Sequence, residues 1–142
     1  MPIFEYSSAF ACSAQRLWAF HERPDVIKLL TPPLTPMRII RQTGSLETGS
    51  EKEFALGIWP LEKRWLARHV EYEHGRVFAD LQVTGPFRYW LHRHMFQEDG
   101  AGSRLIDRVE YEFWGGRLMD PIVRRQLGIL FRHRHAVTAQ RA

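Results

Sequence analysis

The pattern over the first thirty residues predicts one strand followed by two short helices. Aromatic and small side chains alternate loosely over residues 3–11, as in a half-buried strand. Ser13 is a typical N-cap, so a helix is expected over Ala14–His21. A second short helix is expected over 25–30, and it ends at Thr31-Pro32-Pro33 because the residue before a proline disfavours helical geometry.

A long run of strand signals follows. Segments rich in β-branched and aromatic residues recur at spacings of roughly 10 to 15 residues, with turn residues between them. The expected strands cover residues 37–42, 50–58, 61–73, 76–84, 87–97 and 103–114. Consecutive strands joined by short turns predict an antiparallel meander.

The end of the chain predicts one long amphipathic helix. Asp120 and Pro121 suit a helix start, and a length of about 20 residues corresponds to roughly 30 Å. Apolar residues recur at helical spacing at Met119, Val123, Leu127, Leu130 and Val137, and the opposite side carries Arg124, Arg125, Arg132 and His135. The apolar side needs a surface to cover. The sequence therefore predicts an α+β fold in which a curved antiparallel sheet wraps around this helix.

Alternation in the last strand indicates which face of the sheet is inside. One face carries Asp107 among Leu105, Val109, Tyr111 and Phe113. A turn centred near Gly100 would pair this strand with the one before it. The expected neighbours are then Phe96 with Leu105, His94 with Asp107, His92 with Val109, and Trp90 with Tyr111.

The preceding hairpin extends the same face. A turn over 85–87 would place Gln82 opposite Trp90, Asp80 opposite His92, and Phe78 opposite His94. The expected interior then holds Asp80, Gln82, His92, His94 and Asp107 in a setting of Phe78, Trp90, Phe96, Tyr111 and Phe113. The other face carries an apolar row at Val77, Ala79, Leu81, Val83, Tyr89 and Leu91. Either the face assignment is wrong there, or a homodimer contact covers the row.

Three interpretations fit the Asp–His neighbours. A buried carboxylate must be paired, so the cluster can be a polar network that specifies the register of the sheet. It can orient the polar end of a ligand, or it can act as a general acid and base, with His94, Asp107, His92 and Asp80 as candidates. A metal site on His92-x-His94 with Asp80 or Asp107 is less favoured than a metal-free histidine ladder, so no metal or cofactor is expected. His69, His74, His133 and His135 are expected on the surface.

Composition fits a single domain over residues 1–142. The chain has 44% hydrophobic residues, five Trp and nine Phe. The tryptophans, Trp18, Trp59, Trp65, Trp90 and Trp114, are spread over the expected elements. This aromatic content favours either an aromatic-lined cavity for a small molecule or ordinary core packing. The one cysteine, Cys12, cannot form an internal disulfide, and no phosphate-binding or nucleophile motif occurs.

The charge distribution and the first residues predict which partners and which location to expect. The formal net charge is +4, and the basic residues near the C-terminus are interpreted as a solvated helix face, with no nucleic acid as partner. No stretch has the roughly 18 uncharged apolar residues that a spanning helix needs. The first ten residues have no basic region, so we expect no signal peptide, no membrane insertion and a cytoplasmic location.

The element order and several local sequences resemble the START-like (SRPBCC) superfamily, in particular its bacterial polyketide cyclase/dehydrase-like branch. The matching segments are Trp18-Ala-Phe-His21, Leu30-Thr-Pro-Pro33, Phe78-x-Asp80-x-Gln82, Trp90-x-His92-x-His94-x-Phe96 and Leu105-x-Asp107-x-Val109-x-Tyr111. The resemblance covers nearly the whole chain. It implies the helix-grip fold, with a deep cavity between the sheet and the C-terminal helix that takes up an apolar ligand.

Three functions follow as hypotheses. The first is a binding protein for a small hydrophobic or aromatic molecule, a lipid included, with Leu127 and Leu130 of the helix added to the ligand-binding set. The second is a cyclase- or dehydrase-type enzyme that uses His94, backed by Asp107, to move a proton. The third is a dimeric protein-interaction module that uses the apolar outer row.

Overall fold

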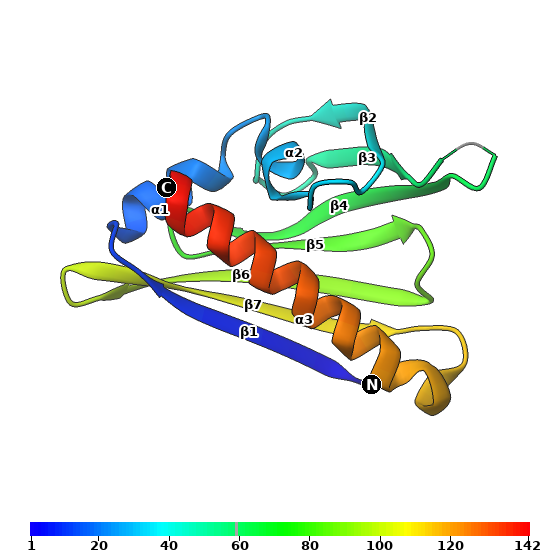
Figure 1. Cartoon of the computed structure of the whole chain (residues 1–142). Coiled ribbons are helices and arrows are strands. Elements are labelled where there is room, and N and C mark those ends of the chain that lie inside the picture. The colour runs from blue at the N-terminus through cyan, green and yellow to red at the C-terminus, as the bar shows by residue number, and fades with distance from the viewer. Residues whose placement is uncertain (59) are drawn as a thin grey trace.

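The computed structural model describes residues 1–58 and 60–142; Trp59 lies outside them. One seven-stranded antiparallel sheet curves around a long C-terminal helix, and two short helices lie at one end (Figure 1). The strands are β1 (Ile3–Phe10), β2 (Met37–Thr43), β3 (Glu51–Leu56), β4 (Lys63–Glu73), β5 (Val77–Thr84), β6 (Tyr89–Asp99) and β7 (Gly102–Glu112), and the helices are α1 (Ala14–His21), α2 (Val26–Leu30) and α3 (Gly116–Arg141). The predicted helix-grip fold is confirmed.

The sheet is a meander closed at one edge by the first strand. Its order is β1-β7-β6-β5-β4-β3-β2, so β1 and β2 are the edges although only α1 and α2 separate them in the sequence. The chain crosses from one edge to the other through these helices (Figure 1). In α1 the Ser13 side chain accepts a hydrogen bond from the amide of Arg16, which caps the helix as predicted.

The register of the central hairpin agrees with the sequence pattern. Phe96 pairs with Leu105, His94 with Asp107, and His92 with Val109 across β6 and β7. Across β5 and β6, Phe78 pairs with His94 and Asp80 with His92, but the ladder ends at Leu81–Leu91. The expected Gln82–Trp90 pair is therefore absent. The Gln82 amide instead bonds the backbone N–H and C=O of Phe87 and closes the turn.

Helix α3 is longer than predicted. It spans 26 residues and starts at Gly116, after Gly115 in a left-handed conformation (φ 85°) that reverses the chain directly after β7. Asp120 is not the N-cap, because its carboxylate accepts bonds from Tyr111 and Arg124 instead. Pro121 consequently lies inside the helix. No helix in the described chain combines the length and hydrophobicity that a membrane crossing requires.

The inner face of α3 packs on the middle of the sheet. Val123, Leu127 and Phe131 join a core cluster with Trp65, Ala67, Trp90, Val109 and Tyr111. Full burial of a large apolar side chain contributes about 1.5–3 kcal/mol, so these contacts hold the helix on the concave side. Further towards the C-terminus the buried positions of the helix are His135 and Thr138, not the expected apolar Val137, which is only half-buried.

Candidate functional site

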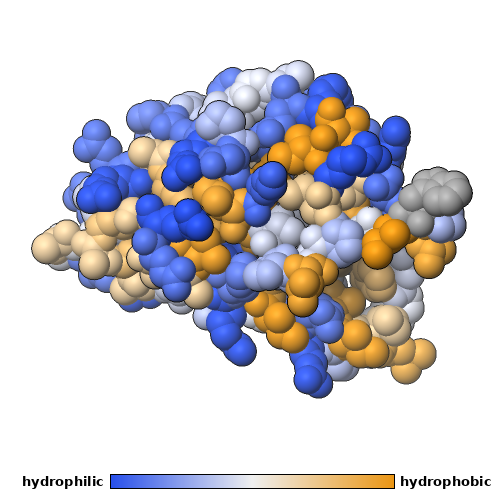
Figure 2. Space-filling model, turned by 45° about the horizontal axis from the view of Figure 1, so that its top comes forward, coloured by the Kyte–Doolittle hydropathy of each residue, from blue (hydrophilic) through white to orange (hydrophobic). Residues whose placement is uncertain are grey.

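A cavity of about 500 Å³ lies between the concave face of the sheet, α2 and α3. Four aromatic side chains, Phe54, Trp65, Phe78 and Trp90, line it from the sheet, and Phe87 lines it from the turn between β5 and β6. Leu127, Ile129 and Leu130 line it from α3. Trp65 and Trp90 meet edge to face at 5.1 Å between ring centroids, which fixes that wall. On the face viewed in Figure 2, hydrophobic side chains gather in patches between hydrophilic ones.

One wall of the cavity is polar and is organised by a single carboxylate. Asp107 of β7 is 4% exposed and accepts hydrogen bonds from two other elements, β6 and α3. Its Oδ1 lies 2.7 Å from His92 Nε2, and its Oδ2 lies 2.6 Å from His135 Nε2. Because an ionised carboxylate only accepts, both imidazoles donate an N–H to it. Asp107 thus connects β6, β7 and α3 beneath the cavity.

His94 bridges the two carboxylates of the cluster. Its Nε2 donates to Asp80 Oδ2 at 3.0 Å, and its Nδ1 lies 3.2 Å from Asp107 Oδ1. The hydrogen bonds of His92 and His94 therefore run diagonally to the strand register, which pairs Asp80 with His92. The His94 ring stacks between Phe78 at 4.0 Å and His92 at 3.6 Å.

These contacts shift the pKa values of His92 and His94 in opposite directions. Burial disfavours a charge on His94, but its two carboxylate neighbours outweigh it and raise the pKa of His94. Burial, together with the neighbouring charge of His94, lowers the pKa of His92. Burial also opposes ionisation of Asp80 and Asp107, yet the imidazole hydrogen bonds hold the pKa of each carboxyl below its ordinary value. These contacts therefore favour a proton on His94, between the two carboxylates, and disfavour a charge on the neighbouring His92.

Two further histidines, which the sequence pattern did not place there, also line the cavity. His69 was expected on the surface, but it is 3% exposed and its Nδ1 donates to the Leu46 carbonyl at 2.8 Å. His21 donates through Nδ1 to the Leu17 carbonyl at 2.8 Å. Burial lowers the pKa of His69, and it lowers that of His21 to about 4. Alternation with Trp65 and Ala67 in β4 is the signal that would have placed His69 inside.

His135 is a second correction. It was expected on the solvent side of the last helix, but it is 4% exposed and lies under α3. Its Nδ1 accepts from the Ser8 hydroxyl at 2.7 Å while its Nε2 donates to Asp107. His135 follows Leu127 and Phe131 at intervals of four, so it continues the buried stripe and ties α3 to β1 and β7. His74 is exposed and His133 is half-buried.

Seven of the twelve residues expected to bind a ligand line the cavity: Phe78, Asp80, Trp90, His92, His94, Leu127 and Leu130. The other five are engaged in hydrogen bonds or packing outside the cavity lining. Asp107 lies behind the histidines, and Gln82 closes the turn at Phe87. Phe96 packs against Trp18, and Phe113 against Phe87. The Tyr111 hydroxyl donates to Asp120; burial and this bond raise the pKa of Tyr111 to about 12.

Asp80, His92 and His94 each offer a ligand atom, and these atoms lie within 4.8 Å of one another. This is the metal set considered from the sequence. In the described residues, however, Asp80 Oδ2 and His94 Nε2 already bond each other, so a cation would have to replace that bond.

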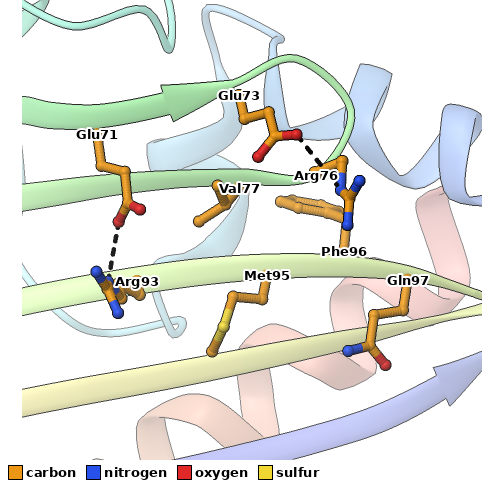
Figure 3. Close-up of a pocket in the computed structure, with 8 residues that line it drawn as sticks. All are labelled: Glu71, Glu73, Arg76, Val77, Arg93, Met95, Phe96 and Gln97. Carbon is orange, nitrogen blue, oxygen red and sulfur yellow. Dashed lines mark hydrogen bonds and ion pairs between the residues drawn. The ribbon is translucent and has the colours of Figure 1, made fainter.

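A second, smaller hollow of about 250 Å³ lies on the outer face of β4, β5 and β6 (Figure 3). Figure 3 shows Glu71 beside Arg93 and Glu73 beside Arg76, at 2.9 Å and 3.6 Å. All four charges are compensated within the hollow. Exposed ion pairs of this kind contribute little stability and leave no free group for a ligand.

Comparison with solved structures identifies the fold. Protein CV1439 from Chromobacterium violaceum matches with a TM-score of 0.76 at 11% identity, over 99% of this chain and 96% of that one. Ara h 8.0201 matches with a TM-score of 0.68 at 13% identity, over 98% of both chains. At such identities the likeness shows the helix-grip fold alone.

A third match covers only part of a longer protein. The nucleoside-diphosphate sugar epimerase from Corynebacterium glutamicum matches with a TM-score of 0.74 at 24% identity, over 96% of this chain but 28% of that chain. No functionally curated protein sequence matches. A family model matches residues 8–142, and the chain therefore belongs to the family described as "Domain of unknown function (DUF8410)".

Proposed function

We propose that the protein binds a small, mainly aromatic or apolar molecule in the cavity between the sheet and α3. The observation that carries this proposal is the cavity itself, in which apolar walls meet a single polar wall. Small-molecule sites typically enclose about 300–1,000 Å³, with apolar lining and a few placed polar groups. A volume of about 500 Å³ lies within that range. The likeness to the polyketide cyclase/dehydrase-like branch is part of this proposal.

The cavity also has a route for entry. Ile129, which lines it from α3, is 48% exposed, and Gln126 on the same helix is exposed as well. On the other side it is bounded by α2 and by Thr31, Pro32 and Thr35. A ligand would enter between α2 and α3, with its apolar body against Trp65 and Trp90.

Fluorescence titration with N-phenylnaphthylamine, a neutral aromatic probe that brightens in apolar surroundings, tests the proposal. We expect saturable binding of one molecule per chain and a rise in melting temperature. Ala67 is buried in the cavity wall, so Ala67→Leu should fill space and weaken binding about tenfold or more. Ala136→Leu, on the exposed side of α3, is the control and should bind as the wild type does. Absent or non-saturable binding, or equal binding by both variants, refutes the proposal.

His92 supports a second candidate, an enzyme that moves a proton. Its Nε2–H donates to Asp107, and no described residue bonds its Nδ1, while the ring lines the cavity. With a lowered pKa, His92 is a neutral base at neutral pH. His94, the group expected from the sequence, has a carboxylate at each nitrogen and no free position for a substrate. The catalytic candidate is therefore His92, with Asp107 as its orienting group.

An aromatic proton-transfer probe tests this candidate. Nitrobenzisoxazole opens when a base removes its C–H proton, because the electron pair forms the nitrile as the N–O bond breaks to a phenolate. We expect the protein to accelerate this ring opening and His92→Gln to abolish the acceleration, while His133→Gln retains it. If His92→Gln opens the probe as fast as the wild type, the cavity contains no catalytic base at this position.

A further inference from the structure

Two cationic side chains in the cavity have no ionic partner among the residues that the structure describes. Lys52 lies on the inner face of β3, the same face as Phe54 and Leu56, and is only 9% exposed. Its side chain lines the cavity. No hydrogen bond or ion pair joins the Lys52 amine to any residue that the structure describes. A lysine buried this far is normally paired.

Arg134 approaches the same cavity from α3. Its guanidinium lies over the Phe131 ring at 5.4 Å, and its Nε is buried without a hydrogen-bond partner. Across residues 1–58 and 60–142, no carboxylate is paired with this side chain. Arginine remains charged at neutral pH, so this wall carries an uncompensated positive charge. Burial lowers the pKa of both Lys52 and Arg134, in keeping with that lack of a partner.

The nearby carboxylates do not compensate these charges. Asp80 and Asp107 influence Arg134 electrostatically, and Asp80 and Glu47 influence Lys52. Among the described residues, however, none of these acids forms an ion pair with either cation: Glu47 is exposed, and both oxygens of Asp107 and Oδ2 of Asp80 are bonded to imidazoles. Asp80 and Asp107 face the imidazoles of His92, His94 and His135, so Lys52 and Arg134 remain without an ion-pair partner among the described residues. A buried charge without a partner is costly, and the cost is removed when a counter-ion binds.

We infer that the ligand is an organic acid: a mainly aromatic or apolar molecule with one anionic group, of carboxylate type, that binds between Lys52 and Arg134. The inference rests on the proposed function, because it names the chemistry of the molecule that fills the cavity. An anionic group supplies the ion-pair partner that Lys52 and Arg134 lack, and the apolar walls accommodate the rest of the molecule. The same two cations disfavour a metal ion at Asp80, His92 and His94.

A matched pair of probes separates this inference from the proposed function. Anilinonaphthalene sulfonate is N-phenylnaphthylamine with one added sulfonate, so the two differ by the anionic group. We expect the sulfonate to bind at least tenfold more tightly than the neutral probe. Lys52→Met and Arg134→Met, each close in length to the native side chain, should reduce sulfonate affinity about tenfold and leave the neutral probe within about twofold. The exposed Lys63→Met and Arg132→Met are the controls and should change neither affinity.

Stability of the variants gives a second readout. Removing a cation that stabilises the fold lowers the melting temperature. Replacing an unpaired buried cation by an apolar side chain removes a destabilising charge and leaves the melting temperature unchanged or higher. We therefore expect Lys52→Met to melt at the wild-type temperature or above it while sulfonate binding falls. Displacement of the sulfonate by naphthoate, but not by naphthylmethanol, would extend the result to carboxylates.

The outcomes are distinct. If neither probe binds, the proposed function fails. If both probes bind with equal affinity, or if Lys52→Met and Arg134→Met leave the sulfonate affinity unchanged, the cavity binds ligands but the anion site is refuted.

Discussion

Acid sensitivity of His21 offers a quantitative test of the buried histidines. His21 is 4% exposed, and burial lowers its pKa from 6.5 to about 4. The unfolded chain therefore takes up a proton below about pH 6.5, whereas the folded protein takes it up only near pH 4. The unfolded state binds more protons in this window, so the free energy of unfolding falls as the pH decreases through it.

The size of the effect follows from the shift. One unit of pKa corresponds to about 1.4 kcal/mol, and between about pH 8 and pH 4.5 the shift of His21 costs about 2.5 kcal/mol. His21→Gln cannot titrate. We expect the unfolding free energy of this variant to decrease by about 2.5 kcal/mol less than that of the wild type over the same interval.

Urea denaturation followed by tryptophan fluorescence at both pH values measures this difference. His74→Gln, which alters an exposed histidine, is the control and should show the wild-type dependence. If His21→Gln loses as much stability towards acid as the wild type does, His21 is not the buried neutral imidazole that the structure places beside His94.

Three further outcomes test other parts of the structure. Asp107→Asn weakens the hub that holds His92, His94 and His135, and urea denaturation should show a loss of about 3–5 kcal/mol, the cost of breaking a buried pair; a loss below about 1 kcal/mol would contradict a structural role for the hub. Phe131→Ala removes a fully buried ring under α3 and should lower the free energy of unfolding by about 3–5 kcal/mol in the same assay. An unchanged free energy of unfolding would show that this contact does not hold the helix on the sheet. The outer apolar row around Leu81 is proposed as a homodimer contact, so analytical ultracentrifugation should detect a dimer that Leu81→Glu dissociates, whereas a monomeric wild type at high concentration would remove that proposal.

The inner face of β6 and β7 was predictable because successive side chains of a strand point to opposite faces of the sheet. Once Asp107 is assigned to the apolar side of β7, the turn at Gly100 determines its neighbours on β6. The same logic, applied to β3 and β4, would have placed Lys52 and His69 inside. His69 was expected on the surface, although Trp65 and Ala67 precede it at every second position of β4, and no position was assigned to Lys52.

The helix and the hydrogen bonds were harder to predict. The pattern gave α3 its position but not its start, because Asp120 and Pro121 resemble a helix N-terminus and the left-handed Gly115 leaves no periodic signal. Register places Asp80 opposite His92, yet the side chains bond along the diagonals. Such choices depend on rotamers and on α3, which supplies His135 from a distant part of the chain.

A crystal structure of the protein with N-phenylnaphthylamine would test the central claim most directly, because it locates the ligand. The account predicts one molecule between α3 and the sheet, with its rings against Trp65 and Trp90 and its edge towards His92. The probe bound only outside this cavity, or side chains filling the space so that no molecule enters, would contradict it.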